Sequence, residues 1–407
     1  MNMMRFAFSR FLSMLLVMVG ATALVLSAPI NVCAVVGDSV NVNVPSPSGP
    51  YPVGTLEFRL VDNNRNDPFL RDGSKRELMV RLWYPALRAD RCTAAPYTSP
   101  KVWAYLADLL HLPAPSVQTN SCWQAPALQG AHPVILASHG YTGLFTDYTF
   151  LFEDLASRGY VVASVAHTYE TTVVQFPDGT LRTSVFGSHF AEDSLRMDDA
   201  SLEFAMSARL GDLKFVIGEL ARLNRTGSPL AGRLDLSRVG VFGHSMGAST
   251  AMSSLRHLPS LKAAVLVDPI VFPTSSTRGS DKPVLLISEG REDWSESECE
   301  VWGNLRGARV AVVFRGAEHL TPSDAVWLGD SVPPLHVETG TMGLERTVAA
   351  TRNYVAAFFE AHLLGKPASL LLNGLSTEFA DAAITTQAHS LCVRSPRSTA
   401  QKMHDPE

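Results

Sequence analysis

The sequence has no long run of charge of either sign. Its 34 basic and 39 acidic residues are mixed along 407 positions and leave a formal net charge of -5. Such a surface exerts no strong pull on phosphate polymers or anionic lipid headgroups, so we expect no nucleic-acid partner. Charged residues make up 18% of the chain and hydrophobic residues 46%. This composition excludes disorder and predicts a folded protein with a large core.

Motifs of metal and nucleotide chemistry are also missing. The sequence contains no CxxC pair, no HExxH motif and no phosphate-binding P-loop. Internal repeats and low-complexity tracts are absent from it as well. We therefore expect no cofactor and no metal ion.

Cysteine is scarce, with five in the whole chain. The first of them, Cys33, follows a segment typical of export, in which Arg5 and Arg10 precede an apolar run over residues 11–28. We expect residues 1–34 to be a signal peptide whose cleavage removes Cys33. Because the run is nearly long enough to cross a bilayer, an N-terminal membrane anchor is the alternative.

Export changes what the other four cysteines can do, since paired thiols persist in an oxidising compartment. Cys92 and Cys122 flank a Pro-rich segment, and Cys299 with Cys392 would tie the C-terminal tail to the body. Two disulfides are therefore one interpretation. Buried free thiols are the other, because spacing alone does not determine connectivity.

The remainder of the chain divides into a linker, a body and a tail. Residues 35–50 include the Pro- and Ser-rich linker, residues 51–375 form the expected catalytic domain, and residues 376–407 form the tail. Within the body, two segments rich in turn residues interrupt the regular pattern, at 85–130 and 170–193. We expect both to lie over the sheet as lids or binding loops, with surface elaboration as the alternative.

Short apolar runs alternate with helical patterns along the body. The predicted strands are residues 55–61, 78–83, 134–137, 161–165, 239–242, 263–267, 284–287 and 310–314. The predicted helices are residues 148–157, 195–223, 246–255, 297–305 and 344–363. This alternation predicts an α/β fold with a mostly parallel, doubly wound sheet of about eight strands and helices on both faces.

A turn between a predicted strand and a predicted helix carries the clearest chemical signal. Residues 243–247 read GHSMG, directly after the strand at 239–242 and before an Ala- and Ser-rich helix. In this context the G-x-S-x-G pattern predicts that Ser245 has a strained backbone, with its hydroxyl exposed at the carboxyl edge of the sheet. The turn and the alternating elements together predict an α/β-hydrolase fold with Ser245 as nucleophile.

A serine hydroxyl is a weak nucleophile and needs a general base, which in this fold lies late in the chain. Of the twelve histidines, His319 alone follows both Ser245 and a terminal buried strand. We therefore predict that His319 is the base. Four other histidines are expected to be supporting or surface residues: His139, His167, His244 and His257.

The acid that orients the imidazole should follow a strand between Ser245 and His319. Asp268 ends the strand at 263–267, and Asp293 follows the strand at 284–287, where most members of the fold keep their acid. Strand-end position alone slightly favours Asp293.

An oxyanion needs two backbone donors in this fold. One comes from the residue after the nucleophile and one from the loop after an early strand. Here these residues are Met246 and Tyr141. Tyr141 lies in the segment SHGYTG at 138–143, whose glycines give the backbone freedom to direct an N–H toward the site.

Four blocks occur in order along the chain: SGPYPVG at 48–54, LWYP at 82–85, SHG at 138–140 and DLASRGYVVA at 154–163. Together they resemble the successive blocks of the platelet-activating factor acetylhydrolases and their bacterial relatives. The resemblance extends to about residue 362. It implies a serine esterase acting on small or lipid-derived esters, similar to 1-alkyl-2-acetylglycerophosphocholine esterase.

The resemblance also implies a choice of acid. In that family the acid lies in a V-D-x-x-x-F-P block, which VDPIVFP at 267–273 matches, so Asp268 is selected and Asp293 is the fallback. The family's H-x-x-F-x-D block is similar to residues 319–324. Here Asp324 is kept and Pro322 replaces the aromatic residue. The pocket wall beside the imidazole is therefore expected to differ.

Two alternatives remain open. The GYT segment at 140–142 and the HSM segment at 244–246 also resemble bacterial polyester hydrolases of the cutinase type. A non-catalytic, lipid-binding member of the fold is the second alternative. The sequence leaves open the acyl chain length, the alcohol part of the substrate and the oligomeric state.

Overall fold

The structure is a computed structural model of the chain. It describes residues 41–88, 92–111, 114–185, 199–225, 227–270, 279–290, 294, 296–331, 339–369, 371–374, 378–379, 382–385 and 392. The proposed signal or anchor at residues 1–34 therefore lies outside the described residues. Among those that are described, no helix is both long and apolar enough to cross a membrane.

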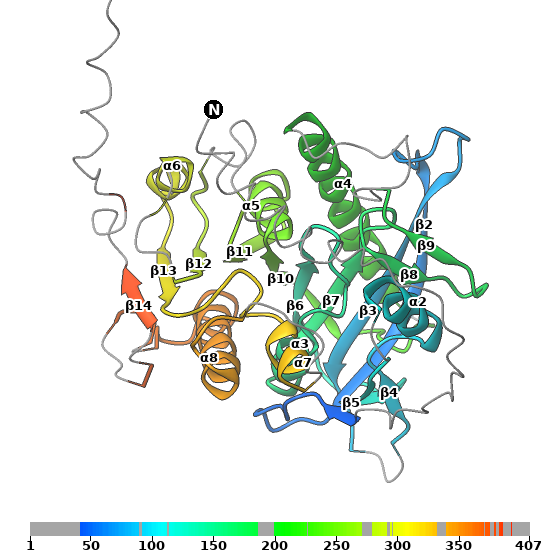
Figure 1. Cartoon of the computed structure of the whole chain (residues 1–407), viewed down its shortest axis with the longest axis horizontal. Helices are drawn as coiled ribbons and strands as arrows, with labels where there is room; N and C mark the ends of the chain where they lie inside the picture. Colours follow the sequence, from blue (N-terminus) through cyan, green and yellow to red (C-terminus); the bar gives the residue numbers. More distant parts are fainter. Residues whose placement is uncertain are drawn as a thin grey trace, which may run out of the picture.

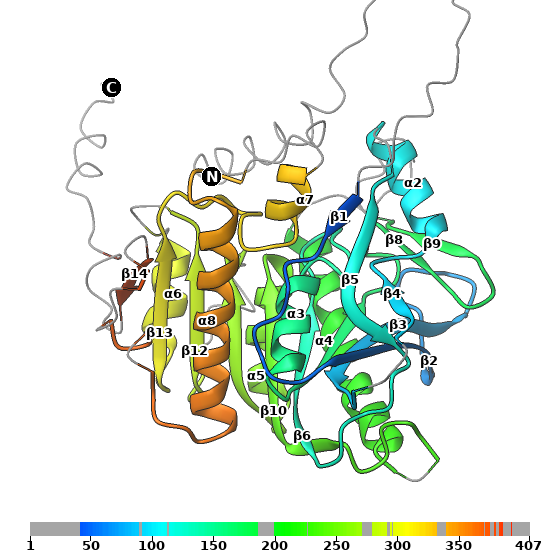
Figure 2. The same ribbon diagram turned by 90° about the horizontal axis from the view of Figure 1, so that it is seen from below.

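Twelve strands of the described chain form one mixed sheet, which is parallel through its centre. Its order is β1 (Asn41–Asn43), β5 (Ser116–Trp123), β2 (Val53–Asn66), β3 (Lys75–Pro85), β7 (Val161–Ala166), β6 (His132–Ser138), β10 (Leu234–His244), β11 (Leu261–Val267), β12 (Val284–Ser288), β13 (Arg309–Phe314) and β14 (Ala382–Thr385), with β4 (Ala94–Pro96) pairing with β5. β14 is one edge of this sheet, at one side of the molecule in Figure 2, and β1, paired with β5, is the other edge.

Helices cover both faces of this sheet (Figure 1). One face packs against α3 (Thr149–Ser157), α7 (Ala325–Ser331) and α8 (Leu344–Leu363). The other face packs against α4 (Asp199–Leu223), α5 (Met246–His257) and α6 (Glu296–Asn304). The central strands are buried on both sides, which explains why they read as continuous apolar runs rather than as an alternating pattern.

The predicted α/β-hydrolase fold is confirmed, and the eight predicted strands are β2, β3, β6, β7, β10, β11, β12 and β13. The prediction of about eight strands was nevertheless too low. The described structure adds four strands to this sheet: β1 within the expected linker, β4 and β5 within segment 85–130, and β14 within the expected tail. The edge strands β1 and β14 are short, and their pairing depends on neighbours far away in the sequence: β1 pairs with β5 and β14 with β13.

The two predicted insertions contain regular elements. Segment 85–130 includes β4, α2 (Pro100–Leu110) and β5, and β5 extends the main sheet beside β2, so this segment is not simply a lid. In segment 170–193, β8 (Val173–Gln175) and β9 (Leu181–Thr183) form a hairpin. Residues 186–193 lie outside the described chain. The hairpin is anchored by a bridge between Thr171 and Thr142, so it lies next to the predicted oxyanion loop.

Of the two interpretations left open for these four cysteines, the structure supports the disulfides. Cys92 is bonded to Cys122 across 30 residues, and Cys299 is bonded to Cys392 across 93 residues. The first bond fastens the start of segment 85–130 to β5. The second holds the C-terminal segment near α6, consistent with the addition of β14 to the sheet edge.

Candidate active site

Ser245 occupies the turn between β10 and α5. Its φ of 55° and ψ of -122° are strained for a residue with a side chain. Small neighbours permit this turn: a Cβ atom on Gly243 would lie 2.1 Å from the carbonyl oxygen of Gly247, and one on Gly247 would lie 2.1 Å from that of Ser138. The Ser245 N–H donates to the Val267 carbonyl at 2.8 Å, which ties the turn to β11. Ser245 therefore lies at the carboxyl edge of the sheet, as predicted. The residue is only 2% exposed, however, so the expectation that its hydroxyl is open to solvent is wrong.

Asp268 follows β11, and His319 lies on the loop after β13. Nδ1 of His319 donates a hydrogen bond to Oδ2 of Asp268. The N–H of Glu289 donates to the other carboxylate oxygen at 3.2 Å. Asp268 is 4% exposed, whereas the side chain of His319 is 20% exposed. The structure thus brings the two predicted residues together, while Asp293, the fallback acid, lies outside the described residues.

His244 supports the loop that carries His319. Its Nε2 donates to the His319 carbonyl at 3.0 Å, and the two rings lie with centroids 4.7 Å apart. Burial, together with a smaller contribution from the neighbouring His319, lowers the pKa of His244 to about 3. His244 is therefore neutral at pH 7 and acts as a donor, not as a competing base. His257 is exposed at the end of α5.

The loop after β6 lies against the Ser245 turn. A Cβ atom on Gly140 would lie 3.4 Å from the Cβ atom of Ser245. Tyr141 is the next residue along this loop. Met246 is the first residue of α5, a position where a backbone N–H has no acceptor within the helix. Both predicted oxyanion donors therefore belong to backbone segments adjacent to Ser245.

Apolar side chains surround Met246. It is fully buried in a cluster with Leu202, Ala205 and Met206 of α4. Partly buried residues pack against this cluster, namely Phe69, Tyr141, Val185 and Ile270. This side of the site can therefore keep an apolar group away from water.

Two buried histidines, His139 and His167, make hydrogen bonds with the segment that carries the predicted oxyanion donor Tyr141. Nδ1 of His139 donates to the Gly140 carbonyl at 2.7 Å, and its Nε2 accepts the His167 N–H at 3.2 Å. Nδ1 of His167 donates to Asp212 at 3.0 Å, and its Nε2 accepts from the Ser138 hydroxyl at 2.9 Å. Burial lowers the pKa of His139 well below its usual range and that of His167 to about 4. Both rings are therefore neutral at pH 7.

Asp324, the acid that the chain shares with the family's histidine block, makes hydrogen bonds that link two segments of the fold. Its carboxylate accepts hydrogen bonds from the N–H groups of Thr149 and Phe150 at the start of α3. It also accepts from the Tyr97 hydroxyl and the Trp327 indole, each at 2.9 Å. Asp324 therefore connects the segment after His319 to the N-terminus of α3.

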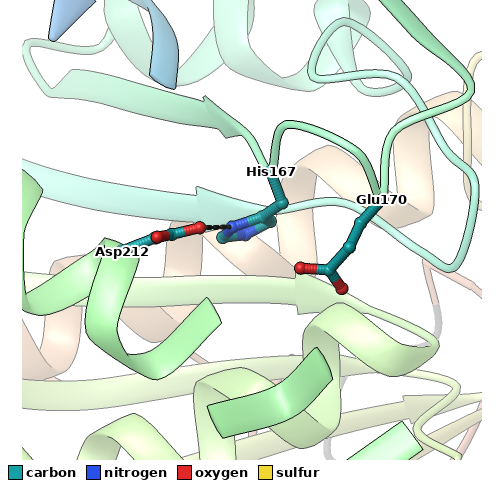
Figure 3. A group of neighbouring side chains, drawn as sticks. All are labelled: His167, Glu170 and Asp212. Atoms are coloured by element: carbon teal, nitrogen blue, oxygen red, sulfur yellow. Dashed lines mark hydrogen bonds and ion pairs between the residues drawn. The ribbon is translucent and has the colours of Figure 1, made fainter. Parts of the chain in front are cut away.

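One buried group in the described chain has the atom types of a metal site. His167, Glu170 and Asp212 offer ligand atoms within 4.8 Å of one another (Figure 3). Two arginines already bind the carboxylates: Arg76 lies 2.7 Å from Asp212, and Arg209 lies 2.7 Å from Glu170. Because these arginines neutralise the acids, we interpret the group as a buried ion network and not as a metal centre.

Sequence patterns did not single out Arg209, although it contacts the loop beside Ser245. Its guanidinium group donates to the His139 carbonyl at 2.6 Å and to the Gly140 carbonyl at 3.3 Å. Arginine in a predicted helix normally faces solvent, so its position in α4 gives no local signal of burial.

Comparison with known proteins finds esterases. The platelet-activating factor acetylhydrolase of Cavia porcellus is 25% identical over 308 residues, covering 69% of this chain and 68% of that protein. Cutinase est1 of Thermobifida alba is 29% identical over 162 residues, covering 40% of this chain and 43% of that one. A solved structure of ferulic acid esterase from Streptomyces cinnamoneus has a TM-score of 0.72 and 35% identity, covering 84% of this chain and 99% of that one.

The sheet, the turn at Ser245 and these relatives define a carboxylic ester hydrolase with the α/β-hydrolase fold. Residues 36–177 and 216–347 match the family of platelet-activating factor acetylhydrolase, isoform II, and the chain belongs to that family. The second matched range includes Ser245, Asp268 and His319. The family resemblance predicted from the sequence is thereby confirmed.

Proposed function

We propose that this esterase acts through an acyl-enzyme formed on Ser245. His319 removes the hydroxyl proton as Ser245 attacks the ester carbonyl, and then delivers that proton to the leaving alcohol. Asp268 holds the imidazole through Nδ1, so that Nε2 is the basic nitrogen. Water, deprotonated by the same imidazole, then releases the acid and restores the serine. The observation that carries this proposal is the hydrogen bond between His319 and Asp268 at the edge where Ser245 lies.

The N–H groups of Tyr141 and Met246 are the proposed oxyanion donors. The proximity of Gly140 to Ser245 and the helix-start position of Met246 support this assignment. Donors already aimed at the developing charge stabilise the transition state more than the neutral carbonyl, which is the origin of their catalytic effect.

The proposed substrates are small or lipid-derived esters with an apolar acyl group. The apolar cluster around Met246 supports this, because it lines one side of the region next to the nucleophile. The relatives point to three ester types: 1-alkyl-2-acetylglycerophosphocholine, esters of ferulic acid, and the polyester substrates that the cutinase alternative implies. The family assignment favours the first type.

A substrate panel tests this proposal. It compares p-nitrophenyl acetate, butyrate and octanoate with 1-alkyl-2-acetylglycerophosphocholine, methyl ferulate and a polyester film. We expect hydrolysis of the short p-nitrophenyl esters and of the acetylated phospholipid. Faster release from the film than from any small ester would favour the cutinase-like alternative. If none of these esters is cleaved, the non-catalytic, lipid-binding alternative would be favoured.

We also propose that the protein is exported. The two disulfides support an oxidising compartment. Whether residues 11–28 are cleaved or retained as an anchor is tested by mass spectrometry of the N-terminus. An N-terminus beyond residue 28 would contradict the anchor.

A further inference from the structure

Arg209 joins helix α4 to the loop beside the nucleophile. Its side chain is completely buried, and Nε lies 2.7 Å from Oε2 of Glu170. Nη1 donates to the His139 carbonyl at 2.6 Å, and Nη2 donates to the Gly140 carbonyl at 3.3 Å. One planar cation thus contacts a carboxylate and two successive backbone carbonyls, a pattern that the rigid guanidinium group can match and a lysine cannot.

The Gly140 carbonyl is held by three donors. Besides Arg209, it accepts from Nδ1 of His139 at 2.7 Å and from the Gly143 N–H at 3.1 Å. In a planar trans peptide the C=O of one residue and the N–H of the next point in opposite directions. Holding the Gly140 carbonyl therefore also sets the direction of the Tyr141 N–H, which points away from that carbonyl.

Glu170 fixes Arg209 in turn. Glu170 is fully buried, and its N–H donates to the His167 carbonyl at 2.9 Å. Its carboxylate turns toward the neighbouring His167 and Asp212, as Figure 3 shows. Asp212 is bound by the second buried arginine, Arg76. The cation that holds the loop is therefore part of a rigid buried network and not a mobile surface group.

We propose that Arg209, held by Glu170, is a positioning residue that orients the Gly140–Tyr141 peptide so that the Tyr141 N–H faces the oxyanion. This inference rests on the proposed function, because it assigns Tyr141 as an oxyanion donor. In this proposal Arg209 acts through the loop carbonyls that it binds and does not contact the substrate or the reacting atoms. Its effect should therefore appear in transition-state stabilisation and not in substrate binding.

The test compares steady-state kinetics and inhibition by a trifluoromethyl ketone, which forms an anionic tetrahedral adduct with the serine. Arg209→Met alone would leave Glu170 buried without its cation, so Arg209→Met is combined with Glu170→Met to remove both charges. We expect kcat to fall about 100-fold, KM to change less than about threefold, and inhibitor affinity to fall in parallel with kcat.

A second variant keeps the positive charge. Arg209→Lys cannot contact the carboxylate and both carbonyls at once, so we expect an intermediate loss of kcat, about tenfold, with KM retained. Arg352→Met is the matched control. Arg352 is also a buried arginine bound to backbone carbonyls, those of Phe150, Pro45 and Ser46, outside the proposed machinery. The kcat of Arg352→Met per folded molecule should equal that of the wild type.

Wild-type kcat and inhibitor affinity in Arg209→Lys, or in the folded double variant, would overturn the positioning role. An equal loss in Arg352→Met would also overturn it, because that result would indicate general loosening of the fold. The proposed function is judged separately, by Ser245→Ala. Full activity in that variant would refute the acyl-serine mechanism whatever the Arg209 variants do.

Discussion

Nδ1 of His319 donates a hydrogen bond to Oδ2 of Asp268, although the two residues are 51 positions apart in the sequence. They follow β13 and β11, two strands separated in the sheet by β12. The second carboxylate oxygen accepts from the Glu289 N–H, so the carboxylate has a fixed orientation. The bond keeps the proton of a neutral imidazole on Nδ1 and makes Nε2 the basic nitrogen.

Asp268→Asn tests this relationship. An asparagine that offers its NH2 group to Nδ1 favours the wrong imidazole tautomer, so we expect kcat to fall about 10⁴-fold with little change in KM. Asp293→Asn is the comparison, because Asp293 is the fallback acid. We expect kcat of this variant to fall by less than about tenfold. Steady-state hydrolysis of p-nitrophenyl butyrate measures both. A larger loss in Asp293→Asn than in Asp268→Asn would reverse the assignment.

Gly247→Ala should disrupt the turn at Ser245. The added Cβ atom would lie 2.1 Å from the Ser138 carbonyl oxygen, which belongs to the backbone and cannot move without displacing the oxyanion loop. We expect a loss of activity together with a lower midpoint of thermal unfolding. Gly218→Ala in α4 is the matched control: its Cβ would meet no atom within 4 Å, so it should stabilise the protein by about 0.5–1 kcal/mol. Equal behaviour of the two variants would contradict this account.

Asp324→Ala should destabilise the fold more than it affects chemistry. It removes the acceptor for two N–H groups at the start of α3 and for two buried side-chain donors. We expect the free energy of unfolding in urea to fall by about 3 kcal/mol. The control is Asp281→Ala, which removes an exposed ion pair with Arg306 and should leave the urea midpoint unchanged. An unchanged midpoint in Asp324→Ala would refute the structural role.

Asp147 predicts a pH dependence of stability. The pKa of Asp147 is raised to about 7, mainly by burial and to a smaller extent by the nearby Asp324, while the hydrogen bond from the Leu144 N–H opposes the shift. The folded state therefore holds a proton that the unfolded state releases near pH 4, so this group's contribution to stability falls as pH rises from about 4 to 7. Asp147→Asn cannot titrate but keeps an acceptor for Leu144. Its stability relative to the wild type should therefore rise over this pH interval.

Urea unfolding of both proteins at several pH values measures that difference. The difference should grow by at most about 1.4 kcal/mol per pH unit within the interval and be constant above it. A difference that is constant from pH 4 to 7 would show that Asp147 ionises normally in the folded protein.

Local patterns were enough to propose Ser245 as nucleophile and His319 as base, because each proposal depends on a short segment. The GHSMG turn must contain small residues, and His319 directly follows a buried strand. Local patterns did not select the acid, since strand-end position alone favoured Asp293 and only the family block pointed to Asp268. In the structure Asp268 directly follows β11 and its carboxylate is hydrogen-bonded to His319.

The supporting residues could not be predicted for a physical reason. Glu170 and Arg209 meet across 39 positions of sequence, and each resembles an ordinary surface charge in its own segment. The edge strands β1 and β14 are likewise short, and their pairing is set by distant partners. Tertiary contacts, not local propensity, determine both features.

The most direct measurement is the rate of p-nitrophenyl butyrate hydrolysis by Ser245→Ala beside Ser254→Ala. Ser254 is a buried serine of α5, the helix that follows Ser245, and its hydroxyl donates to the Ala251 carbonyl at 2.8 Å. An acyl-serine mechanism predicts that kcat falls about 10⁶-fold in Ser245→Ala, with wild-type turnover per folded molecule in Ser254→Ala. Ser245→Ala hydrolysing the ester as fast as the wild type would contradict it.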